Sequence, residues 1–432
     1  MNKNKMFDWM NLFSFFGIFL GIGLLIFIVF LFVSRPTYKE GFRNLTELKK
    51  YGATIGEFID SDDEDLYIPK YEKYYAKKFS KSCMQKFFEN LKWISSCFGL
   101  TKGAIFSLSF FESILLDVTM YRKKQGWNDN FIQKITLTPI SKVVVFGAVQ
   151  GAYHSLTRDL AQLKKLEIID ENLKIMNPDY YIVFLGNFVN RSPYSLEIFS
   201  MILKLLQINP YNVIALKGKN EAFSSHGQSL YREIEFGMLS GLSSSVKEMV
   251  EMFFQTLPLD VYCMMPVERG KKCMDMFELA PSLIEDVEMF KDMKDDNQAR
   301  IFSFLNQKQE EKVEKCSLLK REETMQLEHG KEINVFCNAV IRDIDKKHEY
   351  EKMDGLRLIG WLNKTIIWTI LSTSAESYRK FLNFFYDAFV VISPAEKMQD
   401  WIITLYNRDI RGKSESFNQR AYYFFTGKEL KK

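Results

Sequence analysis

The chain has 432 residues, enough for two or three domains. Hydrophobic residues make up 47% and charged residues 26%, a composition that excludes a disordered chain. The 58 basic and 54 acidic residues leave a net charge of only +4, so charge gives no reason to expect a nucleic-acid partner. The six cysteines form no C-x-x-C pair and there are four histidines, which argues against a zinc knuckle, a disulfide scaffold or a histidine-built site.

An uncharged run of 22 residues, Leu12 to Val33, is the first predicted element. At about 1.5 Å per residue it spans the core of a bilayer. It is too long for a signal peptide and no small-residue cleavage site follows it, so residues 1–34 are predicted to be a transmembrane anchor. More basic residues follow the run than precede it. The positive-inside rule then predicts a single-pass protein with its large C-terminal part in the cytoplasm.

Three stretches outside the predicted core are rich in charge or read as helical. Residues 35–80 are predicted to form a polar juxtamembrane linker with an acidic run at 60–65. Residues 81–141 read as a helical extension, because apolar residues between 105 and 115 recur near helical spacing. Residues 291–330 are densely charged and are predicted to be an exposed helical insertion.

A repeated pattern of strand, glycine turn and helix begins at residue 142. Short β-branched runs end at or near a glycine, and helical stretches separate them, which predicts an α/β core with a mostly buried sheet. The predicted strands are 142–146, 180–185, 212–216, 365–371 and 400–405, and the predicted helices are 155–168 and 195–207.

Functional groups in such sheets lie in the loops beyond the carboxyl ends of the strands. Here these loops are Gly147-Ala-Val-Gln-Gly151, Gly186-Asn-Phe-Val-Asn-Arg-Ser192 and Gly218-Lys-Asn-Glu221. They contain neither a pair of carboxylates nor a nucleophile beside a histidine, and the chain has no Walker-type loop or G-x-S-x-G elbow. By their chemistry alone the loops would be assigned a structural role.

In order and distance the three loops resemble the signature blocks of the phosphoprotein phosphatases, a branch of the calcineurin-like metallophosphoesterases. That family has Gly-Asp-x-His-Gly, Gly-Asp-x-Val-Asp-Arg-Gly and Gly-Asn-His-Glu at these places. Flanking residues match too, at Tyr153, Leu156, 193–197, 210–213, 257–259 and 279–282. The resemblance implies a four-layer metallophosphoesterase-type sandwich, two β-sheets flanked by helices, over residues 142–432. It also implies an active site with two divalent metal ions, such as manganese, iron or zinc, that hydrolyses phosphoric monoesters.

The chain departs from the family where the chemistry resides. The family's metal-ligand positions are occupied by Ala148, Gln150, Asn187 and Lys219. The proton-donating histidine falls on Asn220, the aspartate that orients it on Asn190, and two later ligands on Met276 and Ile344. Alanine and lysine are unsuitable ligands, and an ammonium would repel a dication. The comparison therefore implies no metal, no other cofactor and no catalytic residues.

Arg191 matches the family arginine that holds phosphate oxygens. Two roles are open for it: an anion contact together with Lys219, or an internal ion pair with Glu221 or another acid. His154 and His226 lie near the loops but outside the aligned catalytic positions, so both are expected to be surface or loop histidines.

The retained scaffold and lost ligands predict a membrane-anchored pseudophosphatase that acts as a binding or scaffold module for a protein or a phosphorylated ligand. The alternative is a divergent but active protein serine/threonine phosphatase-like phosphoesterase, which would use other carboxylates: Asp159, Asp179 or Glu221. A third possibility is a structural membrane protein that oligomerises through its anchor.

Overall fold

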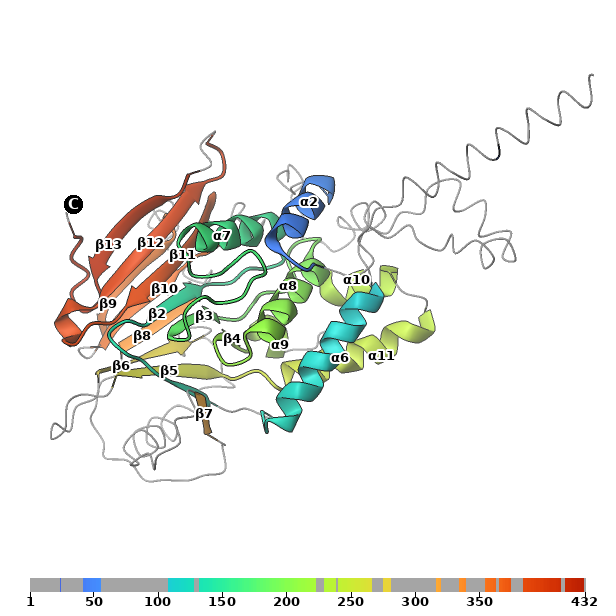
Figure 1. The fold of residues 1–432 in the computed structure, drawn as a ribbon, viewed down its shortest axis with the longest axis horizontal. Helices are drawn as coiled ribbons and strands as arrows, with labels where there is room; N and C mark the ends of the chain where they lie inside the picture. The colour runs from blue at the N-terminus through green and yellow to red at the C-terminus, as the bar shows by residue number, and fades with distance from the viewer. Residues whose placement is uncertain are drawn as a thin grey trace, which may run out of the picture. The chain divides into compact units, whose positions relative to one another are not determined.

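The chain divides into two units, Met1–Glu40 and Gly41–Lys432, and every described residue except Leu24 belongs to the second. The computed structural model describes residues 24, 42–55, 108–127, 132–222, 229–237, 240–265, 275–280, 316–319, 334–338, 354–362, 365–373, 384–412 and 416–430. The fold is a mixed α/β arrangement of two sheets and several helices (Figure 1).

A six-stranded sheet in the order β13-β12-β11-β2-β3-β4 carries the predicted loops (Figure 1). Strands β2, β3 and β4 are parallel, and β11, β12 and β13 continue the sheet antiparallel from β2. The parallel pairs are joined through helices, because parallel neighbours need a crossover connection. The bounds are β2 Lys142–Phe146, β3 Tyr180–Phe184, β4 Val213–Ala215, β11 Tyr386–Ser393, β12 Ile402–Asp409 and β13 Asn418–Tyr423.

A seven-stranded mixed sheet has the order β7-β1-β5-β6-β8-β10-β9. Parallel pairs join β1 to β5, β6 to β8 and β8 to β10, and the remaining neighbours are antiparallel. The bounds are β1 Ile132–Thr136, β5 Asp260–Met265, β6 Asp275–Ala280, β7 Cys316–Leu319, β8 Asn334–Asn338, β9 Leu356–Leu362 and β10 Thr365–Ile370.

The hydrophobic core contains residues from both sheets. Val143, Val145 and Val183 of the six-stranded sheet share one buried cluster with Val261 and Cys263 of the other sheet. Side chains alternate between the faces of a strand, so Phe146 and Phe184 stack on the opposite face of the six-stranded sheet, with ring centroids 5.0 Å apart. Both faces of β2 and β3 are therefore buried, which explains their continuous apolar sequences.

Helices cover the outer face of the six-stranded sheet (Figure 1). Helix α7 contacts β11, and α8 contacts both β4 and α7. Helix α6 packs on α8 and α11, whereas α2 packs on α7. Most residues of α8 are buried, including the polar Glu197 and Ser200. The bounds are α2 Leu45–Ile55, α6 Leu108–Lys124, α7 Tyr153–Lys165, α8 Ser195–Ile208, α9 Lys219–Ala222, α10 Ser229–Gly237 and α11 Ser240–Phe254; a 3₁₀ turn spans Met398–Asp400.

The predicted strands and helices of the core are confirmed within one to a few residues at their ends, but three segments differ from the prediction. The linker 35–80 contains α2, whose apolar residues Leu45, Leu48, Tyr51 and Ile55 are buried. The extension 81–141 contains β1 as well as α6, so the sheets begin before residue 142. Of the insertion 291–330 only residues 316–319 are described, and they form a strand.

The predicted anchor, residues 12–33, lies outside the described residues apart from Leu24. No helix in the described part of the chain is both long and apolar enough to cross a membrane.

Candidate functional site

The loops after β2, β3 and β4 meet at the carboxyl ends of these strands. The backbone N–H of Gln150 donates to the Asn187 carbonyl at 2.9 Å, and that of Gly151 donates to the Phe188 carbonyl at 2.9 Å. A Cβ atom on Gly186, where φ is +78°, would lie 2.4 Å from the backbone nitrogen of Gly218. Glycine at this position lets the second and third loops approach each other closely.

Glu221 of α9 occupies the centre of this arrangement. Its carboxylate accepts three successive backbone N–H groups, from Asn187 at 2.8 Å, Phe188 at 3.0 Å and Val189 at 3.4 Å. Converging backbone N–H groups form a binding place for an anion, and here a carboxylate of the chain itself fills it. Burial raises the pKa of Glu221 to about 7, although the backbone hydrogen bonds act in the opposite direction.

A second carboxylate fills the N-terminus of α8. The buried Glu233, from α10, accepts the backbone N–H of Ser195 at 2.8 Å and of Leu196 at 2.9 Å. Tyr194 at the N-cap makes no side-chain capping bond, so Glu233 takes over the role of the cap. The free N–H groups at the start of a helix attract anions such as phosphate. At α8 these two N–H groups are bound to Glu233.

The amide side chains of the loops also bond to the backbone. Oδ1 of Asn187 accepts the Asn220 N–H at 3.0 Å, and Oδ1 of Asn190 accepts the Leu230 N–H at 3.0 Å. Nδ2 of Asn220 donates to the Val189 carbonyl at 2.9 Å. Asn187 and Asn190 have φ of 53° and 70°, a left-handed conformation that asparagine tolerates better than most residues. These contacts give the amides a structural role in holding the loops.

The remaining predicted positions are distributed over several elements. Ala148 is buried, and its carbonyl accepts the Thr373 hydroxyl at 3.2 Å; Gln150 is also buried. Lys219 begins α9 and Met276 lies in β6, whereas Ile344 lies outside the described residues.

Arg191 is exposed and adopts φ of 57°. Both carboxylate oxygens of Glu221 accept backbone N–H groups, and no ion pair links Glu221 to Arg191. The internal pairing with Glu221 is therefore absent, and Arg191 stands on the outside of the second loop.

These residues do not fit a pair of divalent metal ions. At the aligned positions that the structure describes with side chains, the donors are neutral amides, and the Oδ1 atoms of Asn187 and Asn190 already accept backbone hydrogen bonds. Within the described ranges, no three His, Cys, Asp or Glu side chains gather closely enough to hold a metal. Ions that need anionic oxygen or imidazole ligands find no such set in these loops.

The carboxylates considered for a divergent enzyme lie elsewhere or are engaged. Asp159 is fully buried in α7, where burial and the neighbouring Asp387 raise its pKa, and neither of its oxygens has a hydrogen-bond partner. Asp179 precedes β3 and so lies at the end of the sheet opposite the loops. Glu221 is held by the backbone of the second loop.

Two groups of residues at the site were not predicted from the sequence. Ser372, after β10, accepts the Gly147 N–H at 2.6 Å, and Thr373 contacts the first loop. Helix α2 forms the second group: the Tyr51 hydroxyl donates to Glu197 of α8 at 2.6 Å, and both side chains are buried. Only the three-residue and four-residue spacing of apolar residues in α2 could have indicated a helix there.

Residues next to the first and second loops make further contacts with α2. Tyr153 donates its hydroxyl to the Leu48 carbonyl at 2.8 Å, and Tyr194 donates to the Ile55 carbonyl at 3.1 Å. His154 Nε2 lies 3.0 Å from the Gly52 carbonyl, which places this histidine in the α2 interface. His226 lies outside the described residues. The site is thus a set of loops braced by α2, with its anion-binding backbone groups occupied by glutamates.

No protein-family model matches this chain, and no curated protein matches it. A solved structure similar to it is a protein serine/threonine phosphatase from Saccharomyces cerevisiae, described as similar to human phosphatase PP5. It has 13% sequence identity and a TM-score of 0.42, over 79% of this chain and 97% of the yeast chain. A cold-active protein-tyrosine phosphatase of a psychrophilic Shewanella species has 12% identity and a TM-score of 0.32, over 66% of this chain and 81% of that one. Both likenesses are distant, and neither defines the family of this chain.

Proposed function

We propose that this chain is a membrane-anchored pseudophosphatase that works by binding and not by hydrolysis. The observation that carries the proposal is that the aligned ligand positions hold Ala148 and neutral amides, and that the Oδ1 atoms of Asn187 and Asn190 are bound to backbone N–H groups. The anion-binding backbone groups of the loops are also occupied by the chain's own carboxylates. Glu221 binds the N–H groups of residues 187–189, and Glu233 binds those at the start of α8. A phosphoryl group bound there would have to displace a buried carboxylate.

This occupation favours a protein partner over a phosphorylated ligand. Arg191 is exposed and supplies a positive charge at the rim, but a single arginine without backbone donors makes a weak phosphate site. The α/β domain then serves as a scaffold that presents its outer surfaces to a partner. Residues 12–33 would hold it at a membrane, with the domain on the cytoplasmic side.

The test is metal content together with turnover on one preparation of the full-length protein. After incubation with manganese and removal of free ions, elemental analysis would be paired with hydrolysis of an aryl phosphate. We expect near-zero bound metal and no turnover above the buffer rate, because the aligned positions carry no anionic ligands. An active metallophosphatase treated in the same way is the positive control.

The variant Arg191→Ala separates real activity from contamination. Chelator-sensitive turnover with roughly two ions per chain, lost in Arg191→Ala, would contradict the proposal and support an active phosphoesterase. Turnover that is unchanged in Arg191→Ala and has no accompanying metal belongs to a contaminant, and leaves the proposal standing.

A further inference from the structure

Three connections lead into the parallel strands at the end of the six-stranded sheet opposite the candidate site. These entry connections are residues 137–141 before β2, 166–179 before β3 and 209–212 before β4. Hydrogen bonds join them: the Lys142 N–H donates to the Asp179 carbonyl at 3.3 Å, and the Ile175 N–H donates to Oδ1 of Asn209 at 2.9 Å. Because neighbouring strands are only about 5 Å apart, the three connections form one surface.

Each entry connection carries an exposed apolar side chain. Ile140 and Met176 are 65% and 59% exposed, the highest values among the large hydrophobic residues in the described part of the second unit, and Tyr211 is 45% exposed. Pro139 and Pro178 are exposed as well. Apolar groups in water are unfavourable, and several of them at one end of a domain mark an interaction surface.

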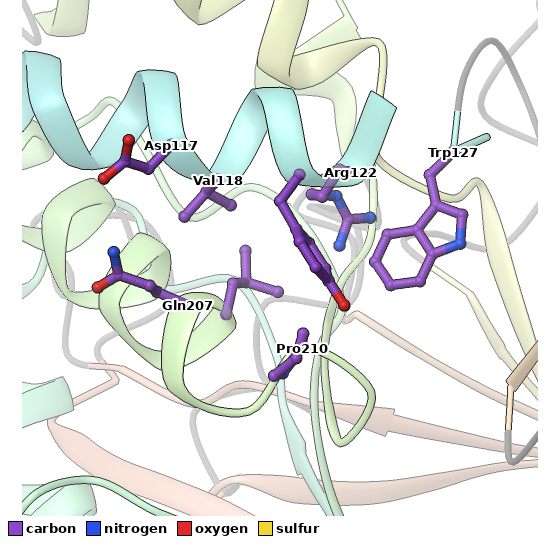
Figure 2. A pocket seen from close by; sticks show the side chains of 8 residues that line it. Asp117, Val118, Arg122, Trp127, Gln207 and Pro210 are labelled. Atoms are coloured by element: carbon purple, nitrogen blue, oxygen red, sulfur yellow. The ribbon is translucent and has the colours of Figure 1, made fainter. Parts of the chain in front are cut away.

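Tyr211 is held in place at this end. Its hydroxyl is hydrogen-bonded to that of Tyr121 at 3.0 Å, and its ring meets the Trp127 ring edge to face, at 6.3 Å and 87°. Figure 2 shows the neighbouring Pro210 and Trp127 on the walls of a pocket of about 140 Å³ between α6 and α8. Part of the Tyr211 side chain is thus packed on the protein while the rest is exposed. Tyrosine suits the boundary between lipid and water, because it combines an apolar ring with a hydroxyl.

The charges around the entry connections balance. The connection 166–179 contains four acidic residues and one lysine. Lys164 and Lys165 at the end of α7 and Lys142 at the start of β2 offset the other three negative charges, and Lys164 forms an ion pair with Glu171 of this connection. An interaction at this surface therefore depends on the apolar side chains and not on charge.

Helix α2 begins at this same end of the domain. The Thr46 hydroxyl donates to Oε1 of Glu171 at 2.7 Å, beside the end of α7. At the other end of α2, the Tyr194 hydroxyl donates to the Ile55 carbonyl at 3.1 Å, beside the start of α8. Eleven residues, 34–44, separate α2 from the predicted anchor, and they can reach at most about 40 Å. The chain thus enters the domain at the end that carries the entry connections.

We propose that this end of the domain rests on the lipid surface of the membrane, with Ile140, Met176 and Tyr211 in contact with the bilayer. In the reverse orientation the link 34–44 would have to run back along α7, whose 13 residues are about 20 Å long. Three side chains bind a bilayer only weakly by themselves, but the tether makes the contact intramolecular. The inference rests on the anchor of the proposed function. It leaves the candidate site facing the cytoplasm, where a protein partner can reach it.

Photocrosslinking in the full-length protein tests this contact. Met176→p-benzoylphenylalanine places the probe at the entry connections, and Phe236→p-benzoylphenylalanine is the matched control. Phe236 is 46% exposed in α10, three residues after Glu233, which binds the start of α8 beside the loops. Each protein is inserted into phosphatidylcholine vesicles that contain a fluorescent phosphatidylcholine. After irradiation, gel electrophoresis measures the lipid attached to the protein, and flotation of the vesicles measures how much protein is anchored.

We expect at least about fivefold more lipid per anchored chain at position 176 than at position 236, because only the former faces the bilayer. Ile140→Asp, combined with the probe at 176, should lower the yield about threefold, because it places a charge against the lipid. Phe236→Asp, combined with the same probe, should leave the yield unchanged. Vesicles that also contain phosphatidylserine should give the same yield, because the charges at this surface balance.

Flotation and crosslinking separate a failure of the anchor from a failure of this inference. Protein that does not float with the vesicles would contradict the anchor, and the inference with it. Protein that floats but crosslinks lipid equally at positions 176 and 236, or at neither, would keep the anchor and overturn the inference. A crosslinked band of doubled chain mass at position 176, without attached lipid, would also overturn it and make this end an interface between copies.

Discussion

At the scale of single residues, buried carboxylates occupy the backbone N–H groups of the loops. Glu221 binds three backbone N–H groups and is almost wholly removed from water. Removal from water disfavours its charged form more than the hydrogen bonds favour it, so its pKa rises from 4.5 to about 7. The protonation state of this glutamate is therefore linked to folding.

The free energy of unfolding should fall as the pH rises from about 4.5 to about 7. In this window the folded chain holds a proton on Glu221 that the unfolded chain has released, so raising the pH favours unfolding. The contribution is fully present below about 4.5 and is lost as the pH passes about 7. At about 1.4 kcal/mol per pH unit it amounts to about 3 kcal/mol.

Urea unfolding at pH 5 and pH 8 measures this change in the wild type and in Glu221→Gln. The glutamine keeps an acceptor oxygen but cannot titrate, so its unfolding free energy should change less with pH. Asp159, whose pKa is also raised, contributes in the same direction in both proteins. Equal pH dependence in the two proteins would show that Glu221 does not titrate in this range.

Asp159 and Asp387 are neighbouring buried carboxyls with opposite expected effects on stability. Asp159 has no hydrogen-bond partner for either oxygen, whereas Asp387 accepts Arg158 Nε at 2.5 Å and Nη2 at 3.2 Å. Asp159→Leu should raise the unfolding free energy at pH 8 by about 1–3 kcal/mol, because it removes a buried polar group of similar size. Asp387→Leu should lower it by about 1–3 kcal/mol, because it breaks a partly buried, charge-assisted ion pair with Arg158. Two changes of the same sign would contradict this assignment.

At the level of elements, α8 depends on a residue from another helix. Its N-cap side chain makes no capping bond, and Glu233 of α10 accepts the first N–H groups instead. Such a distant cap ties α10 to α8 and holds the start of α8 beside the second loop. It also keeps those N–H groups away from outside anions.

Glu233→Ala should therefore lower the unfolding free energy by about 1–3 kcal/mol, because two buried N–H groups lose their acceptor. Glu235→Ala, two residues further along α10, is the matched control. Glu235 is exposed and pairs with Lys247 at 2.5 Å, so its loss should cost less than about 1 kcal/mol. Chemical denaturation of both variants tests the difference, and equal losses would refute the capping role.

The helices and strands of the core were predictable because each carries its own periodic pattern. Apart from Lys142 and Leu185, every residue in the runs 142–146 and 180–185 is β-branched or aromatic, as expected for strands with two buried faces. Helix α2 was missed because charged residues conceal its apolar face, Leu45, Leu48, Tyr51 and Ile55. That face is buried because it meets α7, a contact that local sequence does not record.

At the scale of the whole molecule, the untested element is the apolar run Leu12–Val33. We expect the full-length protein to stay with membranes after washing at high pH, because 22 uncharged residues span the bilayer core. Phe19→Arg together with Leu24→Arg should release it, since each arginine at the centre of a span costs about 3 kcal/mol.

Protease treatment of sealed vesicles tests the orientation. A cytoplasmic domain should be digested in inside-out vesicles, where the cytoplasmic face of the membrane is exposed to the protease. Retention of the double arginine variant on washed membranes would contradict the anchor, because the protein would then be held by another part of its surface.

The sequence by itself determined which side chains stand in the three loops. The loops carry alanine at 148, amides at 187, 190 and 220, and lysine at 219. These side chains differ from the metal ligands of the phosphoprotein phosphatases, and that difference does not depend on the fold. The tertiary structure decided which groups bind the backbone N–H groups of these loops. Glu221 and Glu233 fill the anion-binding N–H groups, and α2 braces the loops, through contacts between residues distant in sequence. Such contacts depend on how the sheets and helices pack, and packing is a property of the whole chain.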